Sequence, residues 1–355
     1  MLPILIAFFT IIFLMVCHEF GHFLAARKFN VEVEEFGIGY KPRIWGRKIG
    51  KTFFSLNLLP FGAFVKIKGE EGTLEDYSSL NSKPIWQRAL ILLGGIISFW
   101  LIAAVILSLL FATGIPQAID DETPLKNPIV QIVYVAPNSI AEALKIKMGD
   151  MIVDLKCQNE KCPPIMANKL KEVSEFLKTH SNEEIILTIK RGGKISEKVV
   201  ILGDRPLGIQ MARISFVKYP FHQALLKGFY STFALTFFIF RTLFVVLGRA
   251  IIGQPLPPGF ELIGPVGIGS LASQFFQVGF PYFLQLLALV SIGLAVANLL
   301  PIPAADGGKL LFLLIEAIRK KPIPKKIEQN ITAISMAFLL FLMVYITIKD
   351  IIKLF

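Results

Sequence analysis

Four long apolar runs dominate the hydrophobic pattern of this 355-residue chain. They cover residues 2–26, 89–113, about 282–303 and about 329–348. A helix needs about 20 apolar residues to cross the hydrocarbon core of a bilayer, so each run predicts a transmembrane helix. The second run carries no charge, whereas the first is interrupted by three ionisable side chains, His18, Glu19 and His22.

Two regions outside these runs show the apolar and polar alternation that is typical of β-strands. Within residues 32–70, glycines alternate with aromatic and β-branched residues, which predicts short strands joined by close turns. Residues 125–205 predict a separate α+β domain. Its expected strands are 129–135, 151–155, 185–189 and 198–202, and its expected helices are 139–144 and 169–179.

The composition indicates a membrane protein rather than a water-soluble one. Hydrophobic residues make up 54% of the chain and charged residues only 18%, whereas soluble domains average about 25% charged residues. The net charge is +11, but no basic stripe with interleaved aromatic residues is present. The sequence therefore predicts the lipid bilayer as a partner and does not predict a nucleic acid.

The distribution of charge predicts the orientation of the first two spans, because loops rich in Lys and Arg stay in the cytoplasm. Arg27 and Lys28 directly follow the first run. Its C-terminal end is therefore expected in the cytoplasm, and the second run leads outward. Residues 115–215 carry 14 basic and 13 acidic side chains, and a nearly neutral block of this kind can be translocated.

A fifth apolar run, residues 229–252, is interrupted by two arginines. Residues 309–326 carry six basic side chains and one acidic side chain, so they are expected in the cytoplasm. An odd number of crossings must then separate them from the outer block, and the run at 282–303 supplies one. We therefore expect 229–252 to lie along the outer interface as an amphipathic helix, unless residues 262–280 also span.

The chemistry of the chain is concentrated in His18-Glu19-Phe20-Gly21-His22, which has the form H-E-x-x-H. On a helix the two histidines lie one turn apart on the same face, where they can bind one zinc ion. Glu19 beside them would take a proton from the attacking water. The alternative is that these residues only hold helices together, but three ionisable groups in an apolar span are costly without a metal.

A catalytic zinc usually has three protein ligands, and the best-placed third ligand is Asp306. It lies between Asn298 and Gly308, in a stretch whose two prolines and two glycines break the helix. A basic residue follows each motif within five residues, so both motifs are expected at a similar depth near the cytoplasmic side. The alternative is an aspartate that caps the next helix. Asn298 is expected either to bind the substrate backbone or the developing oxyanion, or to cap the broken helix.

These motifs make the chain similar to the site-2 protease family of intramembrane zinc metalloproteases, in particular to its bacterial RseP-type members. The resemblance covers nearly the whole chain and also includes Gly264-Pro-Val-Gly-Ile268. It implies Zn²⁺ as the cofactor and Glu19 as the catalytic base. The ligands that it implies are His18, His22 and Asp306.

The resemblance also implies two accessory parts. Residues 32–70 would form a membrane-associated β-loop near the zinc. A free strand edge in this loop could hold an unwound substrate by backbone hydrogen bonds, and Gly37 and Gly39 are expected to bind the substrate. A plain cytoplasmic hairpin is the alternative. The pattern from Ala136 to Ile152 resembles one PDZ domain, which would bind a peptide terminus or act as a steric filter. The chain departs from the family in having Ala305, where Leu is usual, and room for only one PDZ module.

Cys157 and Cys162 flank a polar loop, with no further Cys or His close in the sequence. Two thiols are too few for a zinc site, so a local disulfide is expected if the loop faces an oxidising compartment. His180 and His222 are expected to be surface or interfacial residues without a special role.

The sequence thus predicts a polytopic α-helical membrane protein with about four transmembrane helices, a membrane-associated β-loop and one inserted α+β PDZ domain. The expected parts are a first span (1–28), the β-loop and a cytoplasmic loop (29–84), a second span (85–114), the PDZ domain (115–212), interfacial helices with a re-entrant segment (213–280), a third span (281–308), a cytoplasmic basic loop (309–328) and a fourth span (329–355).

The predicted function is that of a zinc metalloendopeptidase of the bacterial cytoplasmic (inner) membrane, which cleaves transmembrane segments of single-pass membrane proteins. The resemblance suggests an anti-sigma factor or a remnant signal peptide as the substrate. The main alternative is a non-catalytic membrane PDZ scaffold with a structural metal. A transporter is a weaker alternative, because broken helices and polar groups at mid-membrane depth also occur there.

Overall fold

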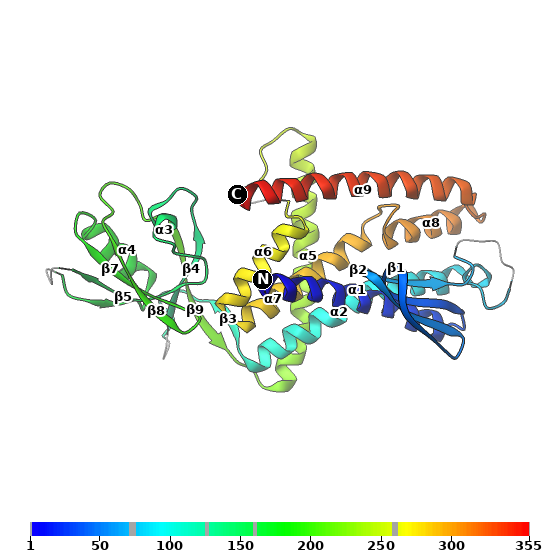
Figure 1. Ribbon diagram of the computed structural model, residues 1–355, viewed down its shortest axis with the longest axis horizontal. Helices are drawn as coiled ribbons and strands as arrows, with labels where there is room; N and C mark the ends of the chain where they lie inside the picture. Colours follow the sequence, from blue (N-terminus) through cyan, green and yellow to red (C-terminus); the bar gives the residue numbers. More distant parts are fainter. Residues whose placement is uncertain (1, 71–75, 125–127, 159–161, 258–261, 355) are drawn as a thin grey trace. The chain divides into compact units, whose positions relative to one another are not determined.

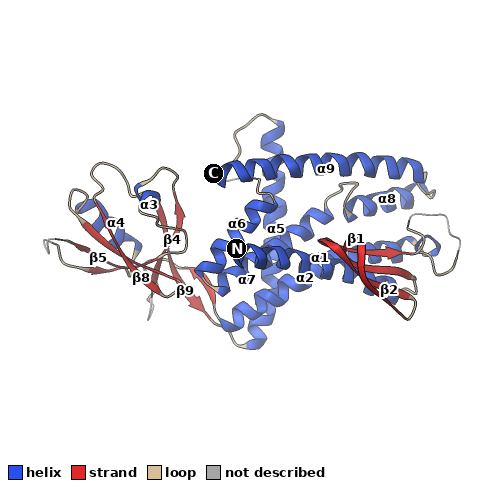
Figure 2. Cartoon of the chain, in the orientation of Figure 1, coloured by secondary structure: helices blue, strands red, loops and turns tan. Residues whose placement is uncertain are grey.

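The computed structural model describes residues 2–70, 76–124, 128–158, 162–257 and 262–354. The chain divides into two compact units. We call the first the helical unit, which comprises Met1–Leu107, Gly228–Ser270 and Leu287–Phe355. We call the second the strand-rich unit, which comprises Ser108–Lys227 and Leu271–Leu286. Strands gather in two places, a two-stranded sheet and a seven-stranded sheet (Figure 2).

Long helices account for most of the chain outside these sheets (Figure 1). They are α1 (Leu2–Lys28), α2 (Ile85–Thr113), α5 (Phe221–Ile251), α6 (Pro265–Val278), α7 (Phe280–Leu299), α8 (Asp306–Arg319) and α9 (Lys325–Leu354). Among the described residues, α1, α2, α5, α7 and α9 are long and apolar enough to cross a membrane. Each of the four expected spans therefore falls in such a helix. The interfacial position expected for 229–252 stays a prediction, since length and composition alone would also allow α5 to span.

The small sheet consists of β1 (Val33–Ile49) and β2 (Thr52–Ile67), which pair antiparallel. The two strands are longer than the short strands expected from the sequence, and both bend. The first half of β1 is paired on both sides, so that Phe36 stands opposite Val65 on one side and Phe54 on the other. Among the described residues, the end of β2 pairs only with β1, and it therefore forms one edge of the sheet.

Aromatic packing fixes this sheet against the first helix. The ring of Phe23 on α1 lies 5.8 Å from the rings of both Phe36 and Phe54. The same apolar cluster includes Ile67 at the end of β2 and Ile91 on α2. Because α1, α2 and the sheet share one buried cluster, the sheet is held beside the helix that carries the H-E-x-x-H motif.

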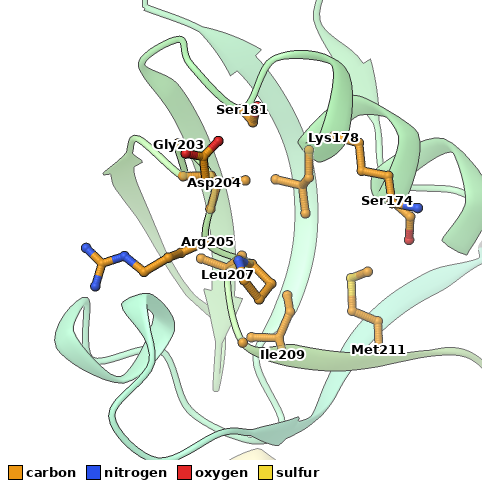
Figure 3. A pocket seen from close by; sticks show the side chains of 13 residues that line it. Ser174, Lys178, Ser181, Gly203, Asp204, Arg205, Leu207, Ile209 and Met211 are labelled. Atoms are coloured by element: carbon orange, nitrogen blue, oxygen red, sulfur yellow. The ribbon is translucent and has the colours of Figure 1, made fainter.

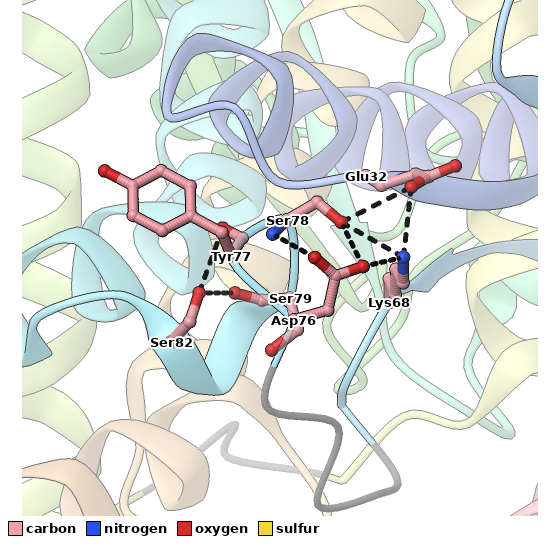
Figure 4. A network of polar contacts seen from close by, with 7 residues as sticks. All are labelled: Glu32, Lys68, Asp76, Tyr77, Ser78, Ser79 and Ser82. Atoms are coloured by element: carbon pink, nitrogen blue, oxygen red, sulfur yellow. Dashed lines mark hydrogen bonds and ion pairs between the residues drawn. The ribbon is translucent and has the colours of Figure 1, made fainter.

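A polar network anchors the chain where it leaves β2 (Figure 4). Lys68 donates hydrogen bonds to Asp76 and to Glu32, and the Ser78 hydroxyl donates to both carboxylates. The Lys68 ammonium lowers the pKa of Asp76 to about 2. This network leads into a single short 3₁₀ turn, η1 (Leu80–Ser82), before α2 begins.

The helix break predicted from the prolines is present between α7 and α8. Helix α7 ends at Leu299, and α8 begins at Asp306 with Ala305 as its N-cap. A Cβ atom on Gly307 would lie 2.1 Å from the carbonyl oxygen of Leu300. Glycine is therefore needed here, because the first turn of α8 rests directly on the backbone of the break.

The expected basic loop at 309–328 is wrong over its first half, because α8 extends to Arg319. Its basic residues stand near the two ends of the helix, while a leucine-rich stretch at 310–314 lies between them. Leu310 packs partly against a buried cluster that also contains Ile96 and Phe99. Apolar contact therefore explains why this charged segment is helical.

The strand-rich unit is an α+β arrangement (Figure 1). Its elements are β3 (Ile115–Ala118), β4 (Ile129–Val135), α3 (Ile140–Ala143), β5 (Met151–Cys157), β6 (Ile165–Met166), α4 (Leu170–Thr179), β7 (Ile185–Arg191), β8 (Lys194–Val200) and β9 (Ile209–Val217). The strand order is β3-β9-β4-β5-β7-β8, with β6 beside β5. All four expected strands and both expected helices are present. Strand β9 runs past the expected boundary at 212.

Candidate metal centre

Helix α1 places the two histidines of the motif one turn apart, as the sequence predicts. Their Nε2 atoms lie 3.3 Å from each other. The ring of His18 stacks on Phe99 of α2 at a centroid distance of 4.7 Å. His22 Nδ1 donates a hydrogen bond of 2.9 Å to the carbonyl oxygen of Ile91. Because Nδ1 carries the proton in this bond, Nε2 of the neutral ring keeps a free lone pair on the side that faces His18. A histidine that binds a metal ion needs such a lone pair.

Asp306 reaches the same point from the start of α8. Its Oδ2 atom lies 3.2 Å from His18 Nε2 and 3.3 Å from His22 Nε2. The three side chains are only 7–13% exposed. The structure therefore brings together the three residues that were predicted as metal ligands from positions nearly 300 residues apart in the sequence.

The arrangement fits a zinc ion. Zinc binds imidazole nitrogen and carboxylate oxygen at about 2.0–2.1 Å, so tetrahedral ligand atoms stand about 3.3–3.4 Å apart. The three observed separations are 3.2, 3.3 and 3.3 Å. The buried Asp306 Oδ2 atom has no hydrogen-bond partner among the described residues. Two imidazole lone pairs and a carboxylate around one point call for a cation.

Glu19 lies beside this group of ligands. Its carboxylate is half-buried and close enough to both histidines and to Asp306 to interact with them electrostatically. It also accepts a hydrogen bond from the backbone N–H of Val65, near the end of β2. The predicted catalytic base therefore stands between the metal centre and an edge of the small sheet.

The sequence reasoning missed two glycines of α2 that let the helices approach. A Cβ atom on Gly94 would lie 2.7 Å from the carbonyl oxygen of Gly21 on α1. A Cβ atom on Gly95 would lie 2.3 Å from His22 Nε2 and 2.5 Å from His18 Cε1. The adjacent pair of glycines in an uncharged span was a visible signal, but its partner could not be known before the helices were placed.

A partly buried cation also lies near the site, and its partner could not be inferred from the sequence pattern. Lys309 in the first turn of α8 forms an ion pair with Glu70, which follows β2. Burial acts to lower the pKa of Lys309, but the Glu70 carboxylate, with Asp306 and Glu19 at longer range, holds that pKa above its usual range. This pair connects the start of α8 to the segment that follows the small sheet.

The residues predicted to bind substrate have local structural roles. Asn298 donates from Nδ2 to the carbonyl oxygen of Leu294, 3.0 Å away in its own helix. Gly37 leaves room for the Phe64 ring, which a Cβ atom would approach to 2.3 Å. Gly39 has φ +75°, a conformation that favours glycine. A further role of these three residues in binding substrate stays a prediction.

An H-E-x-x-H helix and a distant carboxylate, set among helices long enough to span a bilayer, define the class of membrane-embedded metallopeptidases. Comparison with known proteins agrees with this class. The profile of peptidase family M50 matches residues 6–342. The chain therefore belongs to peptidase family M50, the site-2 protease family, and is an intramembrane zinc protease.

Known relatives align along nearly the whole chain. A protein of Clostridium perfringens is 33% identical over 347 residues, which cover 96% of this chain and 95% of the relative. Zinc metalloprotease RasP of Bacillus licheniformis is 26% identical over an alignment of 441 positions, gaps included, that covers 99% of this chain and 98% of the relative. The regulator of sigma-W protease RasP of Bacillus subtilis is also 26% identical, with the same coverage.

Proposed function

We propose that His18, His22 and Asp306 hold the catalytic zinc and that Glu19 is the general base of peptide hydrolysis. The observation that carries this proposal is the convergence of three ligand atoms at separations of 3.2–3.3 Å beside a fourth, non-ligating carboxylate. A structural zinc site would have four protein ligands and no need of Glu19, whereas a catalytic one keeps a position open.

Different residues of the chain have different roles in hydrolysis. A zinc ion held here supplies a Lewis acid that polarises the scissile carbonyl and makes a water acidic enough to react near neutral pH. Glu19 takes the proton of the attacking water and passes it to the leaving amine. The hydrogen bond from His22 to Ile91 keeps the imidazole in one orientation throughout. Asn298, at the end of α7, is proposed to contact the substrate backbone once a substrate is present.

The substrate class that we propose is the transmembrane segment of a single-pass membrane protein. The peptide bonds of a helix are protected by their own hydrogen bonds, so the scissile region must unwind into an extended strand. The edge formed by residues 63–67 of β2 adjoins Glu19 and presents backbone groups to such a strand. Gly37 on β1 stands opposite Phe64 of this edge in the ladder. A relative named for sigma-W regulation supports an anti-sigma factor as one such substrate.

We further propose that the strand-rich unit is a PDZ-type module that binds extended chain ends. A pocket lies between α4 and β9 (Figure 3), and its apolar lining includes Leu177, Ile209 and Met211. Residues 209–214 of β9 pair with β4 on one side, while on the other side β3 pairs with 214–217 and the N–H of Ile119 donates to the carbonyl oxygen of Arg213. Among the described residues, that side of 209–212 has no partner strand and is available for strand addition. Lys178, which lines the pocket, offers a cation to a terminal carboxylate. A steric filter against bulky ectodomains is the competing role for this unit.

We place the protein in the bacterial cytoplasmic membrane, with the strand-rich unit outside. The named relatives come from bacteria. Arg27 and Lys28 directly follow the first span, and residues 115–215 are nearly neutral. Both features follow the rule that basic loops stay inside.

The test compares Glu19→Gln with the wild type in detergent, using a reconstituted single-pass substrate and metal analysis. We expect the variant to keep its zinc and to lose cleavage by about 10²-fold or more, because only the proton acceptor is removed. Glu122→Gln, which changes an 88% exposed carboxylate, should behave as the wild type.

Metal analysis of His22→Ala and Asp306→Ala completes this test. Both variants should lose zinc together with cleavage, since each removes a ligand atom. Cleavage by Glu19→Gln at the wild-type rate would remove Glu19 from its proposed role. Full zinc content in Asp306→Ala would assign the third ligand elsewhere.

A further inference from the structure

A second group of potential metal ligands lies in the strand-rich unit. Cys157, Cys162, His180 and Glu183 each offer one ligand atom, and these atoms all lie within 4.8 Å of one another. No histidine is close to the cysteine pair in the sequence, but the fold places His180 beside it. The fold brings the turn that follows α4 over the end of β5, so that residues about 20 positions apart in the sequence meet.

The backbone holds these four residues in place. Cys157 is the last residue of β5 and stands opposite Ile185 of β7 in the ladder. The N–H of Glu183 donates to the carbonyl oxygen of His180 at 3.0 Å, which closes the turn between α4 and β7. Cys157 and Cys162 are 5% and 4% exposed and belong to the core of the unit. The two cysteines are therefore built into the core, while the side chains of His180 and Glu183 are 21% and 39% exposed and lie at its edge.

Among the described residues, no lysine or arginine pairs with Glu183, and its ion-pair contact is to His180. Its Oε2 atom lies 3.0 Å from Cys157 Sγ and 3.4 Å from His180 Nδ1. That nitrogen is buried and has no hydrogen-bond partner among the described residues. The two cysteines form a disulfide, and a disulfide sulfur has no hydrogen to donate to the carboxylate. Several electron-pair donors thus face one another around a common point.

We propose that these four groups form a second zinc site when the cysteines are reduced, so that the Cys157–Cys162 disulfide and a bound zinc ion are alternative states of the strand-rich unit. Two thiolates, one imidazole and one carboxylate give the four ligands of a closed structural site. The two cysteines are separated by four residues, within the spacing that such sites use. Their Cα atoms lie 5.5 Å apart, so either state requires only a rotation of the side chains.

Conversion of the disulfide state to the zinc-bound state needs no further reactant from the protein. A tertiary phosphine gives two electrons to the disulfide and takes an oxygen atom from water, and the two hydrogens of that water end on the two sulfurs. Zinc then displaces both thiol protons, which pass to the solvent. The bound site carries a net charge of −1, because two thiolates and one carboxylate meet Zn²⁺ and a neutral imidazole.

The experiment counts zinc per full-length chain in detergent, before and after phosphine reduction and removal of free metal. The reduced wild type is expected to hold one more equivalent than the oxidised wild type, while the metal centre of the helical unit contributes equally to both. The same comparison with Co²⁺ supplies a specific signature. A thiolate-to-cobalt charge-transfer band should rise only on reduction, because the proposed catalytic ligands include no sulfur.

Variants assign the extra equivalent to these residues. Cys157→Ser/Cys162→Ser should hold the same zinc under both conditions and show no cobalt band. His180→Ala should lower the affinity for the second zinc ion by about tenfold or more, since one of four ligands is lost. His222→Ala is the matched control, because it removes the other histidine of the unit and should keep the second equivalent.

Three results would contradict the proposal. Equal zinc in the oxidised and reduced wild type would show that the thiols take no metal, and this comparison needs no variant that must fold. An extra equivalent that persists in His180→Ala would show thiol binding without the proposed site. Circular dichroism of the reduced wild type, with and without zinc, detects unfolding on reduction, and zinc that binds only unfolded chain would also contradict the proposal.

Discussion

At the residue scale, the metal centre depends on the ligands and also on a position of α2 that has no side chain. Gly95 faces both imidazoles and leaves them the space in which their Nε2 atoms meet Asp306. The peptide carbonyl of Ile91, one turn earlier on the same helix, fixes the ring of His22. Helix α2 therefore acts as a template that positions the ligands of α1 without supplying any ligand.

Gly95→Ala is expected to disrupt this template. The new methyl group would stand 2.3 Å from His22 Nε2 and 2.5 Å from His18 Cε1. The His22 ring cannot move aside without losing its bond to Ile91, nor the His18 ring without losing its stacking on Phe99. We expect zinc affinity to fall by about 10–100-fold, the range seen when the groups that orient metal ligands are lost. Zinc titration and substrate cleavage measure the effect.

Gly293→Ala on α7 is the matched control for this substitution. Apart from its chain neighbours and the adjoining backbone of its own helix, no heavy atom of the described residues lies within 4 Å of the position that its Cβ would take. This variant should therefore keep both zinc and activity, and so exclude a general effect of alanine in a membrane helix. Wild-type zinc affinity in Gly95→Ala would show that α1 and α2 adjust to the added methyl group.

The sequence indicates residues of the site only when their pattern is local. His18, Glu19 and His22 could be identified because the spacing within one helix fixes their relation. Asp306 could be proposed from its place beside a helix break. Gly95 could not, since its role exists only where two helices cross, and the contact between Lys309 and Glu70 depends in the same way on the tertiary fold.

At the scale of elements, helix α4 shows how a distant side chain stabilises a helix start. Its N-cap residue, Lys169, makes no capping hydrogen bond from its side chain. Instead the carboxylate of Asp121 accepts hydrogen bonds of 2.9 Å from the backbone N–H groups of Leu170 and Lys171. Burial acts to raise the pKa of Asp121, but these two N–H donors outweigh it and lower that pKa below its usual value.

A lowered pKa in the folded state means that folding favours the ionised form. The stability that Asp121 contributes to the start of α4 is therefore complete above the ordinary carboxyl pKa of about 3.9. It is lost as the pH falls through the lower pKa that Asp121 has in the folded protein. We expect Asp121→Asn to weaken the cap by about 1 kcal/mol at neutral pH. This corresponds to about fivefold lower protection of the first α4 amides.

Amide hydrogen exchange, expressed as protection factors, measures this change. The wild type should lose protection at the start of α4 between neutral and strongly acidic pH, whereas Asp121→Asn should lack this acid-dependent loss. The neighbouring Glu122 is 88% exposed and only approaches Lys171 at 3.7 Å, so Glu122→Gln serves as the control. Equal acid-dependent loss in Asp121→Asn and the wild type would assign it to another group.

Elements with a strong local pattern were predicted well, and those defined by pairing were not. Strand β4 has the bounds 129–135 expected from its alternation, and α4 differs from the expected helix by one residue. The double pairing of β1 was not foreseen, because register is decided by the partner strand and the bends. Helix α8 was mistaken for a loop because the charges at its ends obscured the apolar stretch between them.

At the scale of the whole molecule, the chain combines a helical unit that carries the proposed hydrolytic site with a strand-rich unit that carries the proposed peptide groove. Each unit has a core of its own, formed by different segments of the chain. The two functions proposed for them are therefore separable by experiment. Substitutions at the pocket between α4 and β9 are expected to change substrate selection, whereas substitutions at the β2 edge are expected to affect the cleavage of every substrate.

The need for an extended substrate leads to a prediction about which transmembrane segments are cleaved. Glycine in a helix interior costs about 1 kcal/mol relative to alanine, and proline costs about 3 kcal/mol. A segment that carries either residue beside the scissile bond is already closer to the unwound form that can pair with residues 63–67. We expect alanine-to-glycine substitution there to raise kcat/KM by about fivefold, as measured with reconstituted model substrates that differ at one position.

The control uses the same pair of sequences as short soluble peptides, which have no stable helix to unwind. If helix opening is the step that glycine assists, the two peptides are cleaved at similar rates, and the difference appears only in the membrane-spanning substrates. A fivefold difference in both settings would instead indicate a direct preference of the site for glycine. Equal rates for the two membrane-spanning substrates would show that unwinding does not limit cleavage, and the proposed role of the β2 edge would then lose its main support.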